Sequence, residues 1–407
     1  MNTEKIKELK DFYHKSLLED IIPFWEKSDL IDKEYGGFIS SVDRVGKSYN
    51  EDKSVWFQGR ALWTFSKLCN TYGVKKEWKE AADKGAEFIK NYCIDKTDKR
   101  MYFTVTRDGK PLRKRRYFFS ESFLVVGFAE YYLISENSED LALAREYFKF
   151  MYDMYDDPKN DPFIITPKEN AEVRNLHSNA NPMVLVSAAQ TLLRIDSDNA
   201  DYYNKTIDRV IADMLSLHYK SEHKCVLENV GLDGSILDNP TGRTINPGHC
   251  IENSWFLMNR AVNTNDNDLL QKSLNILRWS LELGWDQEYG GMFYFRDLYN
   301  RPCEQLEHDM KLWWVHNECL IATLAAYNIT GDKYFEDWYN KLHNYIFSHF
   351  PDKEYGEWYG YLHRDGTVSH TQKGSLWKGP YHLPRCMMLC EKILSASAKG
   401  EKFSDLL

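Results

Sequence analysis

The sequence lacks any long apolar segment. Its first residues, MNTEKIKELKDFYHK, are polar and amphipathic, and no apolar run approaches the ~20 residues that cross a bilayer. The net charge of −9 argues against a nucleic-acid or anionic-membrane partner, because both kinds of partner require basic patches. We therefore expect a soluble, cytoplasmic protein with no nucleic-acid or membrane partner.

Several motifs of cofactor chemistry are also missing. The eight cysteines are scattered without CxxC or zinc-like spacing, which predicts reduced and mostly buried thiols. There is no HExxH and no local cluster of two histidines and a carboxylate, although a barrel could still gather distant metal ligands. Neither GxxxxGK[ST] nor a convincing GxGxxG occurs. The sequence thus predicts no metal and no nucleotide site carried by a motif.

Aromatic residues, in contrast, are abundant. Trp, Tyr and Phe number 12, 26 and 21, or 14% of the 407 residues. Such a load is more often found in a core than in a binding site. Carbohydrate sites, however, also place aromatic faces against the apolar C–H faces of sugar rings. Composition alone leaves both interpretations open.

A short segment rich in glycine and aromatic residues recurs six times, at a spacing of roughly 60–67 residues. Each copy alternates apolar and polar residues, and several end in DG-like turns, a pattern typical of β-hairpins. The copies are centred on Phe38, Tyr102, Phe163, Val226, Phe293 and Trp358.

Two helical patterns separate successive hairpins, and the even-numbered helices, each the first helix after a hairpin, are the more apolar. An apolar helix is buried and an amphipathic one covers it, so we expect six inner helices ringed by six outer ones. The pattern predicts an all-α (α/α)6 barrel with short hairpins at one end, a single domain over residues 1–407. A linear helical solenoid is the alternative, which the hairpins disfavour. The expected helices are 3–22, 53–72, 76–93, 119–135, 138–155, 179–195, 201–219, 246–264, 265–285, 310–330, 331–350 and 374–397.

This arrangement predicts where the chemistry lies. Each hairpin leads into the N-terminus of an inner helix, so the polar residues early in these helices converge on one mouth. Arg60, in SVWFQGRALW, is such a residue. A structural arginine paired with a core carboxylate is one interpretation. The other is a clamp on substrate oxygens, since guanidinium presents a rigid fork of donors.

The eighth helix begins at INPGHCIENSWFLMN, where Pro247 and Gly248 mark a helix start. His249 and Glu252 stand three residues apart on one face, and a neighbouring carboxylate can tune a histidine as a base near neutrality. A helix cap or a core histidine is the plainer alternative. The predicted position at the mouth favours the functional interpretation.

The tenth helix begins at KLWWVHNECLIA, with Trp314 and Glu318 four residues apart on one face. A tryptophan pair is more often core packing than a ligand platform. A carboxylate on the same apolar face, however, needs a polar partner. Trp314 and Glu318 are therefore candidates for the site.

The last segment, KGSLWKGPYHLPRCMML, is the least ordinary of the chain. Pro380 and Pro384 break helical regularity, so we expect His382 and Arg385 to be held by irregular backbone at the mouth.

Together, YGGF near residue 35, KLWWVHNE and WKGPYHLPR resemble the N-acyl-D-glucosamine 2-epimerase family over nearly the whole chain. The resemblance implies an (α/α)6 barrel with two catalytic histidines, here His249 and His382. It implies that Arg60 is the family's barrel arginine and Glu318 its carboxylate. Glu252 and Trp377 match neighbours that orient or stack against substrate. The implied substrate-binding residues are Trp56, Asn179, Met183, Glu252, Trp314, Trp377 and Arg385.

Three departures separate the sequence from the cellobiose 2-epimerases of this family. Met183 stands where those enzymes typically have histidine, and His316 stands where they have glutamine. WKGPYHLPR also replaces their WKCPYHNGR. All three favour the N-acylglucosamine branch.

The resemblance implies an isomerase that interconverts N-acetylglucosamine and N-acetylmannosamine. One histidine removes the C2 proton of the open-chain sugar and the other returns a proton, while Arg60 stabilises the oxyanion. The resemblance further implies a homodimer that requires no cofactor, with ATP as a possible activator that is not consumed.

Three alternatives stay open. The first is another 2-epimerase or aldose–ketose isomerase of the family, acting on mannose, glucose or cellobiose. The second is an (α/α)6 glycoside hydrolase using Glu252 and Glu318, since an inverting hydrolase needs two carboxylates about 6.5–9.5 Å apart. The third is a sugar-binding protein without catalysis.

Overall fold

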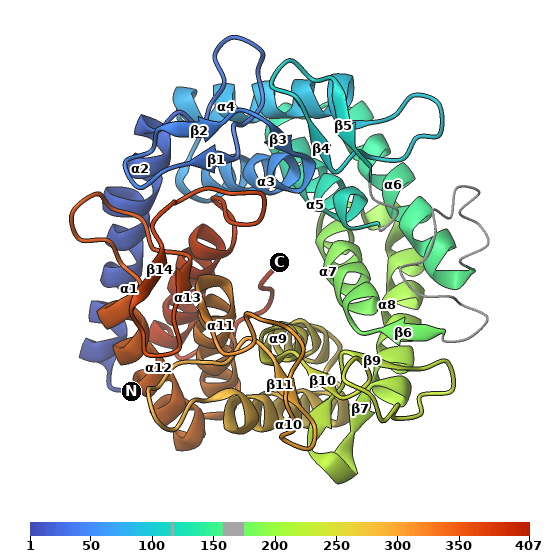
Figure 1. Ribbon diagram of the computed structural model, residues 1–407, viewed down its shortest axis with the longest axis vertical. Coiled ribbons are helices and arrows are strands. Elements are labelled where there is room, and N and C mark those ends of the chain that lie inside the picture. The colour runs from blue at the N-terminus through green and yellow to red at the C-terminus, as the bar shows by residue number, and fades with distance from the viewer. Residues whose placement is uncertain (115–117, 158–174) are drawn as a thin grey trace.

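Two rings of helices, one inside the other, form the body of the molecule (Figure 1). The computed structural model describes residues 1–114, 118–157 and 175–407. The predicted (α/α)6 barrel is confirmed. The inner ring consists of α3 (Val55–Tyr72), α5 (Phe119–Ser135), α7 (Ala180–Ile195), α9 (Pro247–Thr264), α11 (Trp313–Thr330) and α13 (His382–Ala398). The outer ring consists of α1 (Thr3–Lys15), α4 (Lys76–Phe88), α6 (Ser138–Asp156), α8 (Ala200–Leu217), α10 (Asn267–Gly284) and α12 (Lys333–His349).

Two outer helices continue past these bounds. A π-helical turn, Ser16–Ile21, joins α1 to α2 (Ile22–Lys27), and a second, Ile89–Cys93, extends α4. The helical segments 3–22 and 76–93 expected from sequence therefore contain a change of helix type.

The two rings follow from the burial pattern of the sequence. Nearly every side chain of the inner helix α11 is buried, whereas the outer helix α8 buries only one stripe, from Tyr203 to Met214. A helix that is apolar all round must be covered on all sides, and an amphipathic helix supplies that cover. In the described part of the chain, no helix is both long enough and apolar enough to cross a membrane.

Two of the expected helix starts are wrong. The helix expected at 310 begins at Trp313, because Lys311 and Leu312 form strand β12. The helix expected at 374 begins at His382, because residues 374–381, which include Pro380, are irregular. Pro384 then falls in the first turn of α13, where its missing N–H removes no helical hydrogen bond. Irregular backbone is therefore present just before His382, but the expectation that it holds His382 and Arg385 themselves is wrong, because both lie in the first turn of α13.

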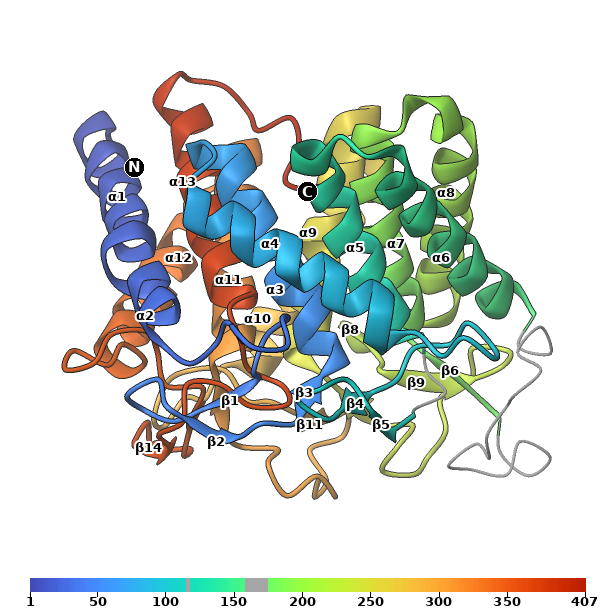
Figure 2. The same ribbon diagram turned by 90° about the horizontal axis from the view of Figure 1, so that it is seen from above.

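The strands cluster at one end of the barrel (Figure 2). The expected six separate hairpins are only partly right, because the strand before an inner helix often pairs with the next repeat. The pairing strands are β3 (Lys53–Ser54) with β4 (Thr104–Val105), β10 (Thr244–Ile245) with β11 (Arg296–Asp297), and β12 (Lys311–Leu312) with β13 (Tyr361–Leu362).

Local hairpins account for other strands. They are β1 (Ser41–Val42) with β2 (Ser48–Asn50), β4 with β5 (Pro111–Arg113), β7 (Tyr219–Lys220) with β8 (Cys225–Val226), and β13 with β14 (Val368–His370). Strand β6 (Leu176–Ser178) pairs with β9 (Asn229–Gly231). The segment near Phe293 supplies only β11, and the hairpin expected near Phe163 lies outside the described residues.

Polar residues early in the inner helices fasten the repeated turns. Gln58 accepts a hydrogen bond from Phe38 N (2.8 Å) and donates one to Phe38 O (2.7 Å). His316 plays the same part in α11, where its Nε2 accepts from Met292 N (2.9 Å) and its Nδ1 contacts Leu312 O (2.7 Å). Burial lowers the pKa of His316 to about 3. His316 is thus a neutral structural residue.

A buried ion cluster joins the last repeat to the first. Asp352 lies 3.1 Å from Lys373 Nζ and accepts hydrogen bonds from Arg44 Nε (2.7 Å) and Nη2 (2.9 Å). The side chains of Asp352 and Lys373 are 1% and 0% exposed. Because Arg44 belongs to the first hairpin, this cluster closes the ring. The same arrangement recurs as Asp32, Lys53 and Arg107, and as Asp286, Lys311 and Arg364.

Replacing Asp352 with asparagine should therefore destabilise the closed ring. We expect the free energy of unfolding to fall by about 3 kcal/mol, since removing one partner strands a buried cation. Urea denaturation followed by circular dichroism measures this loss. Asp365→Asn removes an exposed carboxylate of the neighbouring hairpin and should change stability little. Equal losses in the two variants would contradict a ring-closing role for Asp352.

The C-terminal segment covers the opposite end of the barrel. Phe403 N donates to Asn328 Oδ1 (2.9 Å), and Leu406 N donates to Asn259 Oδ1 (2.8 Å). Phe403 and Leu406 are buried, and the chain end lies over the barrel axis (Figure 1). The barrel interior is therefore approached from the strand end.

Candidate active site

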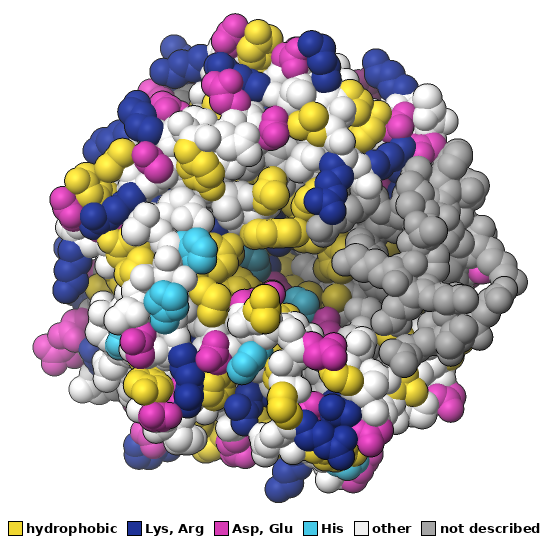
Figure 3. Space-filling model, viewed as in Figure 1, with side chains coloured by type: hydrophobic (Ala, Val, Ile, Leu, Met, Phe, Trp, Pro, Cys, Tyr) yellow, Lys and Arg dark blue, Asp and Glu magenta, His cyan; other side chains and the backbone are white. Residues whose placement is uncertain are grey.

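A cavity of about 610 Å³ opens at the strand end of the barrel. On the face that carries the strands, histidines and hydrophobic side chains surround a central hollow (Figure 3). A volume of this size lies in the range of small-molecule sites, ~300–1,000 Å³. The predicted site residues that line the cavity are Arg60, His249, His382, Trp56, Met183, Glu252, Trp314, Trp377 and Arg385.

Two predicted site residues lie behind this lining. Asn179 is fully buried and accepts a hydrogen bond from Asn253 Nδ2 (3.2 Å). The geometry gives no support to the predicted contact of Asn179 with substrate. Glu318 is also fully buried, and it reaches the cavity only through the side chains that it holds. We therefore place Glu318 among the positioning residues rather than against the substrate.

Both candidate histidines contact the same indole. The ring centroid of Trp314 lies 5.4 Å from that of His249 and 5.7 Å from that of His382. Gly248 makes room for this indole, because a Cβ at that position would lie 2.5 Å from Trp314 Cη2. The first turns of three inner helices thus bring two imidazoles, far apart in sequence, to one place.

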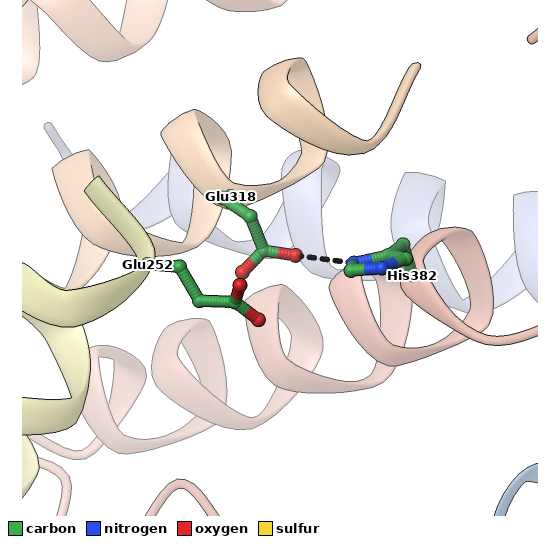
Figure 4. Close-up of side chains that lie close together, drawn as sticks. All are labelled: Glu252, Glu318 and His382. Carbon is green, nitrogen blue, oxygen red and sulfur yellow. Dashed lines mark hydrogen bonds and ion pairs between the residues drawn. The ribbon is translucent and has the colours of Figure 1, made fainter. Parts of the chain in front are cut away.

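A buried ion-pair network holds His382 (Figure 4). His382 Nδ1 lies 2.9 Å from Glu318 Oε1, and Arg385 Nη2 donates to Glu318 Oε1 and to Glu252 Oε1, both at 2.6 Å. Trp255 Nε1 donates to Glu318 Oε2 (2.9 Å). Because an ionised carboxylate only accepts, Nδ1 of His382 carries a proton and Nε2 is left for the cavity.

Three members of this network have the spacing of metal ligands. Glu252, Glu318 and His382 each offer a ligand atom, all within 4.8 Å of one another. Arg385 Nη2, however, lies 2.6 Å from both carboxylates and 3.3 Å from His382 Nδ1. The guanidinium already supplies the positive charge between these groups. We therefore interpret the cluster as an ion-pair network.

The partner of His249 differs from the expected one. His249 Nδ1 lies 3.1 Å from both oxygens of Glu228, whereas Glu252 bonds to Arg385 instead. Glu228 is not among the site residues predicted from the sequence. It stands between β8 and β9, in the fourth repeated segment, KCVLENVGLDGS, directly upstream of the helix that carries His249. A carboxylate within an otherwise apolar strand pattern was the available signal.

The two histidines have pKa values shifted in opposite directions. Burial and the nearby guanidinium groups of Arg385 and Arg60 hold the pKa of His382 well below its usual 6.5. Burial also acts to lower the pKa of His249, but the Glu228 carboxylate outweighs it and the pKa is raised above 6.5. Of the two imidazoles, His382 is therefore the one that loses its proton more easily and His249 the one that keeps it more easily. This is the protonation pattern of a base paired with an acid.

Arg60 has the character of a substrate clamp. Its Nη1 donates to Trp377 O (3.1 Å), and its guanidinium lies 4.0 Å from the ring centroid of Phe123. Within the described residues Arg60 forms no ion pair with a carboxylate. The interpretation of Arg60 as a structural arginine paired with a core carboxylate therefore has no support. Burial lowers the pKa of Arg60 to about 10, so it stays a cation at neutral pH. An oxyanion in the cavity would supply the missing negative charge.

The wall near Arg60 is aromatic. The rings of Trp56 and Trp377 meet edge to face with centroids 5.4 Å apart, and both line the cavity beside Phe119 and Phe123. Trp377 is 40% exposed at the mouth. Charged groups and aromatic faces thus line the same cavity, which suits the hydroxyl and C–H surfaces of a sugar.

Comparison with known proteins agrees with this geometry. A family model described as N-acylglucosamine 2-epimerase (GlcNAc 2-epimerase) matches residues 37–386, which include all the candidate site residues. The chain belongs to the N-acylglucosamine 2-epimerase family. Membership makes it an isomerase, of the epimerase type that acts on carbohydrates.

Within this family the chain is more similar to N-acylglucosamine 2-epimerases than to cellobiose 2-epimerases. It is 34% identical to the N-acylglucosamine 2-epimerase of Rattus norvegicus, over 93% of this chain and 90% of that protein. It is 28% identical to the cellobiose 2-epimerase of Dictyoglomus turgidum, over 95% of this chain and 100% of that protein. The solved cellobiose 2-epimerase of Bacillus thermoamylovorans B4167 shares the fold, with a TM-score of 0.83 and 22% sequence identity. The match covers 95% of this chain and 100% of that one.

Proposed function

We propose that this epimerase interconverts N-acetyl-D-glucosamine and N-acetyl-D-mannosamine at C2 of the open-chain sugar. The observation that carries the proposal is the pair of histidines, His249 and His382, each held by its own glutamate and both against one indole in one cavity. The similarity to N-acylglucosamine 2-epimerases supports the choice of sugar.

In the proposed reaction, neutral His382 takes the C2 proton at Nε2. The electron pair of the C2–H bond forms the C1–C2 double bond of an enolate, the π pair of the C1 carbonyl moves onto O1, and Arg60 stabilises this oxyanion. His249, as imidazolium, then gives a proton to C2 on the other face. The two histidines end with exchanged protonation states, and exchange with water restores them. Base and acid catalysis is sufficient, because the reaction has no net redox change.

The apolar part of the cavity supports an N-acyl sugar. Met183 lines the cavity together with Val126 and Phe256. A thioether and aliphatic or aromatic carbons offer no hydrogen bond to a hydroxyl, whereas they suit the methyl group of an acetamide. Trp56 and Trp377 supply ring faces for the sugar itself.

Isotope exchange tests the proposal directly. Incubating the protein with N-acetylglucosamine in D2O should yield N-acetylmannosamine with deuterium at C2, because the returned proton comes from a histidine in exchange with solvent. Proton NMR of C2 follows both changes. Mannose, glucose and cellobiose, tested in parallel, distinguish the related 2-epimerase and isomerase activities. The absence of both epimer and C2 deuterium for all four sugars would overturn the epimerase proposal.

The hydrolase alternative is not supported by the position of the two glutamates. The bonded oxygens of Glu252 and Glu318 share one nitrogen of Arg385 and lie within 4.8 Å of each other, less than the ~6.5–9.5 Å of an inverting pair. Glu318 is also fully buried, so it cannot meet a glycosidic bond. Release of reducing sugar from an oligosaccharide without exchange at C2 would revive this alternative.

Three further expectations accompany the proposal. The eight cysteines are free thiols, and all except Cys303 are buried, which supports a location in the reducing cytoplasm. The homodimer and the activation by ATP rest on the family resemblance. Sedimentation of the purified protein, and initial rates measured with and without ATP, test these two.

A further inference from the structure

The two catalytic histidines are each held by a glutamate, but the two pairs differ in their surroundings. Glu228 places both oxygens 3.1 Å from His249 Nδ1, and in the described part of the chain no lysine or arginine forms an ion pair with it. Glu318, in contrast, is bonded by His382, by Arg385 and by Trp255 at once. The carboxylate of Glu228 therefore interacts with His249 without a competing cation, whereas the carboxylate of Glu318 interacts with both His382 and Arg385.

We infer that Glu228 is the positioning residue of His249: it fixes the orientation of this imidazole and, as the uncompensated carboxylate of the two pairs, makes His249 the acid and leaves His382 the base in the resting enzyme. This inference rests on the proposed two-histidine epimerase. It adds to it a residue and a division of roles.

The backbone around Glu228 fixes the carboxylate in place. Glu228 N donates to Thr244 O (2.9 Å), and Glu228 O accepts from Asn179 N (2.8 Å). The side chain is 13% exposed, against 25% for His249. The segment between β8 and β9 is thus tied on one side to the residues before α9 and on the other to the start of α7. This explains how a loop residue can set the rotation of a helix residue.

Apart from Glu318 and Glu252 at His382, the charged groups near the two imidazoles favour the same division. His249 is surrounded by Glu228, by Glu252 on its own helix and by Glu318 on α11, and the last two are already paired with Arg385. His382 is bonded to Glu318, which it shares with Arg385, and it also faces the guanidinium groups of Arg385 and Arg60, with Glu252 and His249 nearby. The carboxylate that no guanidinium shares therefore belongs to His249, and the two guanidinium groups act on His382.

This division predicts the pH dependence of kcat/KM. His382 must be neutral, so activity falls as pH decreases through its pKa, which lies well below 6.5. His249 must be protonated, so activity falls as pH rises through its pKa, which lies above 6.5. The same bell-shaped profile applies to the forward and the reverse epimerisation. The ratio of the two kcat/KM values is the equilibrium constant between two uncharged sugars, and this constant does not depend on pH. The basic limb then reports on the pair of His249 and Glu228.

Glu228→Gln should move this basic limb to lower pH. Loss of the carboxylate removes the main group that raises the pKa of His249, and an adjacent opposite charge is worth about 1–3 pH units. The acidic limb should stay in place. Glu228→Asp keeps the charge on a shorter side chain, so its basic limb should lie between those of the wild type and Glu228→Gln. Glu222→Gln, an exposed change in the same β7–β8 region, is the matched control and should leave both limbs unmoved.

A second measurement separates this inference from the proposed function. Titration of the histidine resonances by NMR in protein without sugar, with His249 assigned through the missing signal of His249→Asn, reports on the pair whether or not any sugar turns over. The expected result is a lower pKa of His249 in Glu228→Gln and a smaller decrease in Glu228→Asp. A rate loss with an unmoved basic limb and an unmoved His249 titration in both variants would reduce Glu228 to a structural residue and overturn the inference. If Glu228→Gln fails to fold, Glu228→Asp decides in the same way.

Discussion

Replacing either candidate histidine with asparagine should lower kcat of the epimerase by about 10³-fold, within the 10²–10⁴-fold that positioned acid–base groups contribute. Asparagine cannot take or give a proton at C2, but it fills part of the imidazole volume and keeps polar groups. The introduced amide at position 249 would still face Glu228, and the one at position 382 would still face Glu318. The loss should therefore appear in turnover with little change in the thermal unfolding transition.

The isotope pattern of the two variants is more informative than their rates. If His382 removes the proton from one epimer and His249 from the other, each variant keeps one base. His249→Asn should then exchange the C2 hydrogen for deuterium, without inversion, only in the epimer that His382 deprotonates. His382→Asn should do the same only in the epimer that His249 deprotonates. Proton NMR of C2 in D2O, starting from each epimer separately, measures this.

Two outcomes would contradict the scheme. If one variant exchanges both epimers, a single base serves both faces; if a variant keeps near-wild-type turnover, its histidine is not catalytic. His363→Asn, an exposed histidine of the last hairpin, is the control for a general effect of losing an imidazole. It should behave like the wild type in rate and in isotope exchange.

The extent of successful prediction differs between the fold and its details. The two rings could be predicted because burial all round and burial along one stripe leave different apolar patterns, as in α11 and α8. The pairing of β3 with β4 could not, since a two-residue strand carries no periodicity and its partner belongs to the next repeat. The start of α13 was misplaced because the apolar residues before Pro380 continue the helical pattern although the backbone is irregular there.

The site shows the same limit at the level of single residues. His249 and His382 could be assigned because each opens an inner helix, and the barrel brings such positions to one mouth. Spacing within α9 suggested Glu252 as the partner of His249, whereas the partner is Glu228, 21 residues upstream. A helix face reports only contacts inside one helix, and a contact between a loop and a helix leaves no local pattern. The predicted role of Asn179 lacks support for the related reason that a helix start can face the core, as Asn179 does.

Replacing Arg385 with methionine should cost the protein more stability than any other single change considered above. Arg385 Nη2 is the shared donor of Glu252 and Glu318, which are 6% and 0% exposed. Without it, two carboxylates face each other where water cannot screen them. We expect the free energy of unfolding to fall by about 3–5 kcal/mol at neutral pH, measured by urea denaturation. Arg301→Met removes an arginine from an exposed ion pair with Asp238 and should change stability little.

The pH dependence of this loss follows from its cause. A buried carboxyl group that has lost its cation has a folded-state pKa above its unfolded value, so its contribution to stability is fully present below the unfolded pKa and is lost as pH rises through the folded pKa. The deficit of Arg385→Met should therefore shrink as pH falls from 7 toward 4. Adding Glu252→Gln to Arg385→Met should recover part of the loss, because one of the two facing charges is removed. A deficit that is independent of pH and of Glu252→Gln would show that Arg385 stabilises the barrel by packing against Trp255 and Tyr381, over whose rings its guanidinium lies, rather than by its charge.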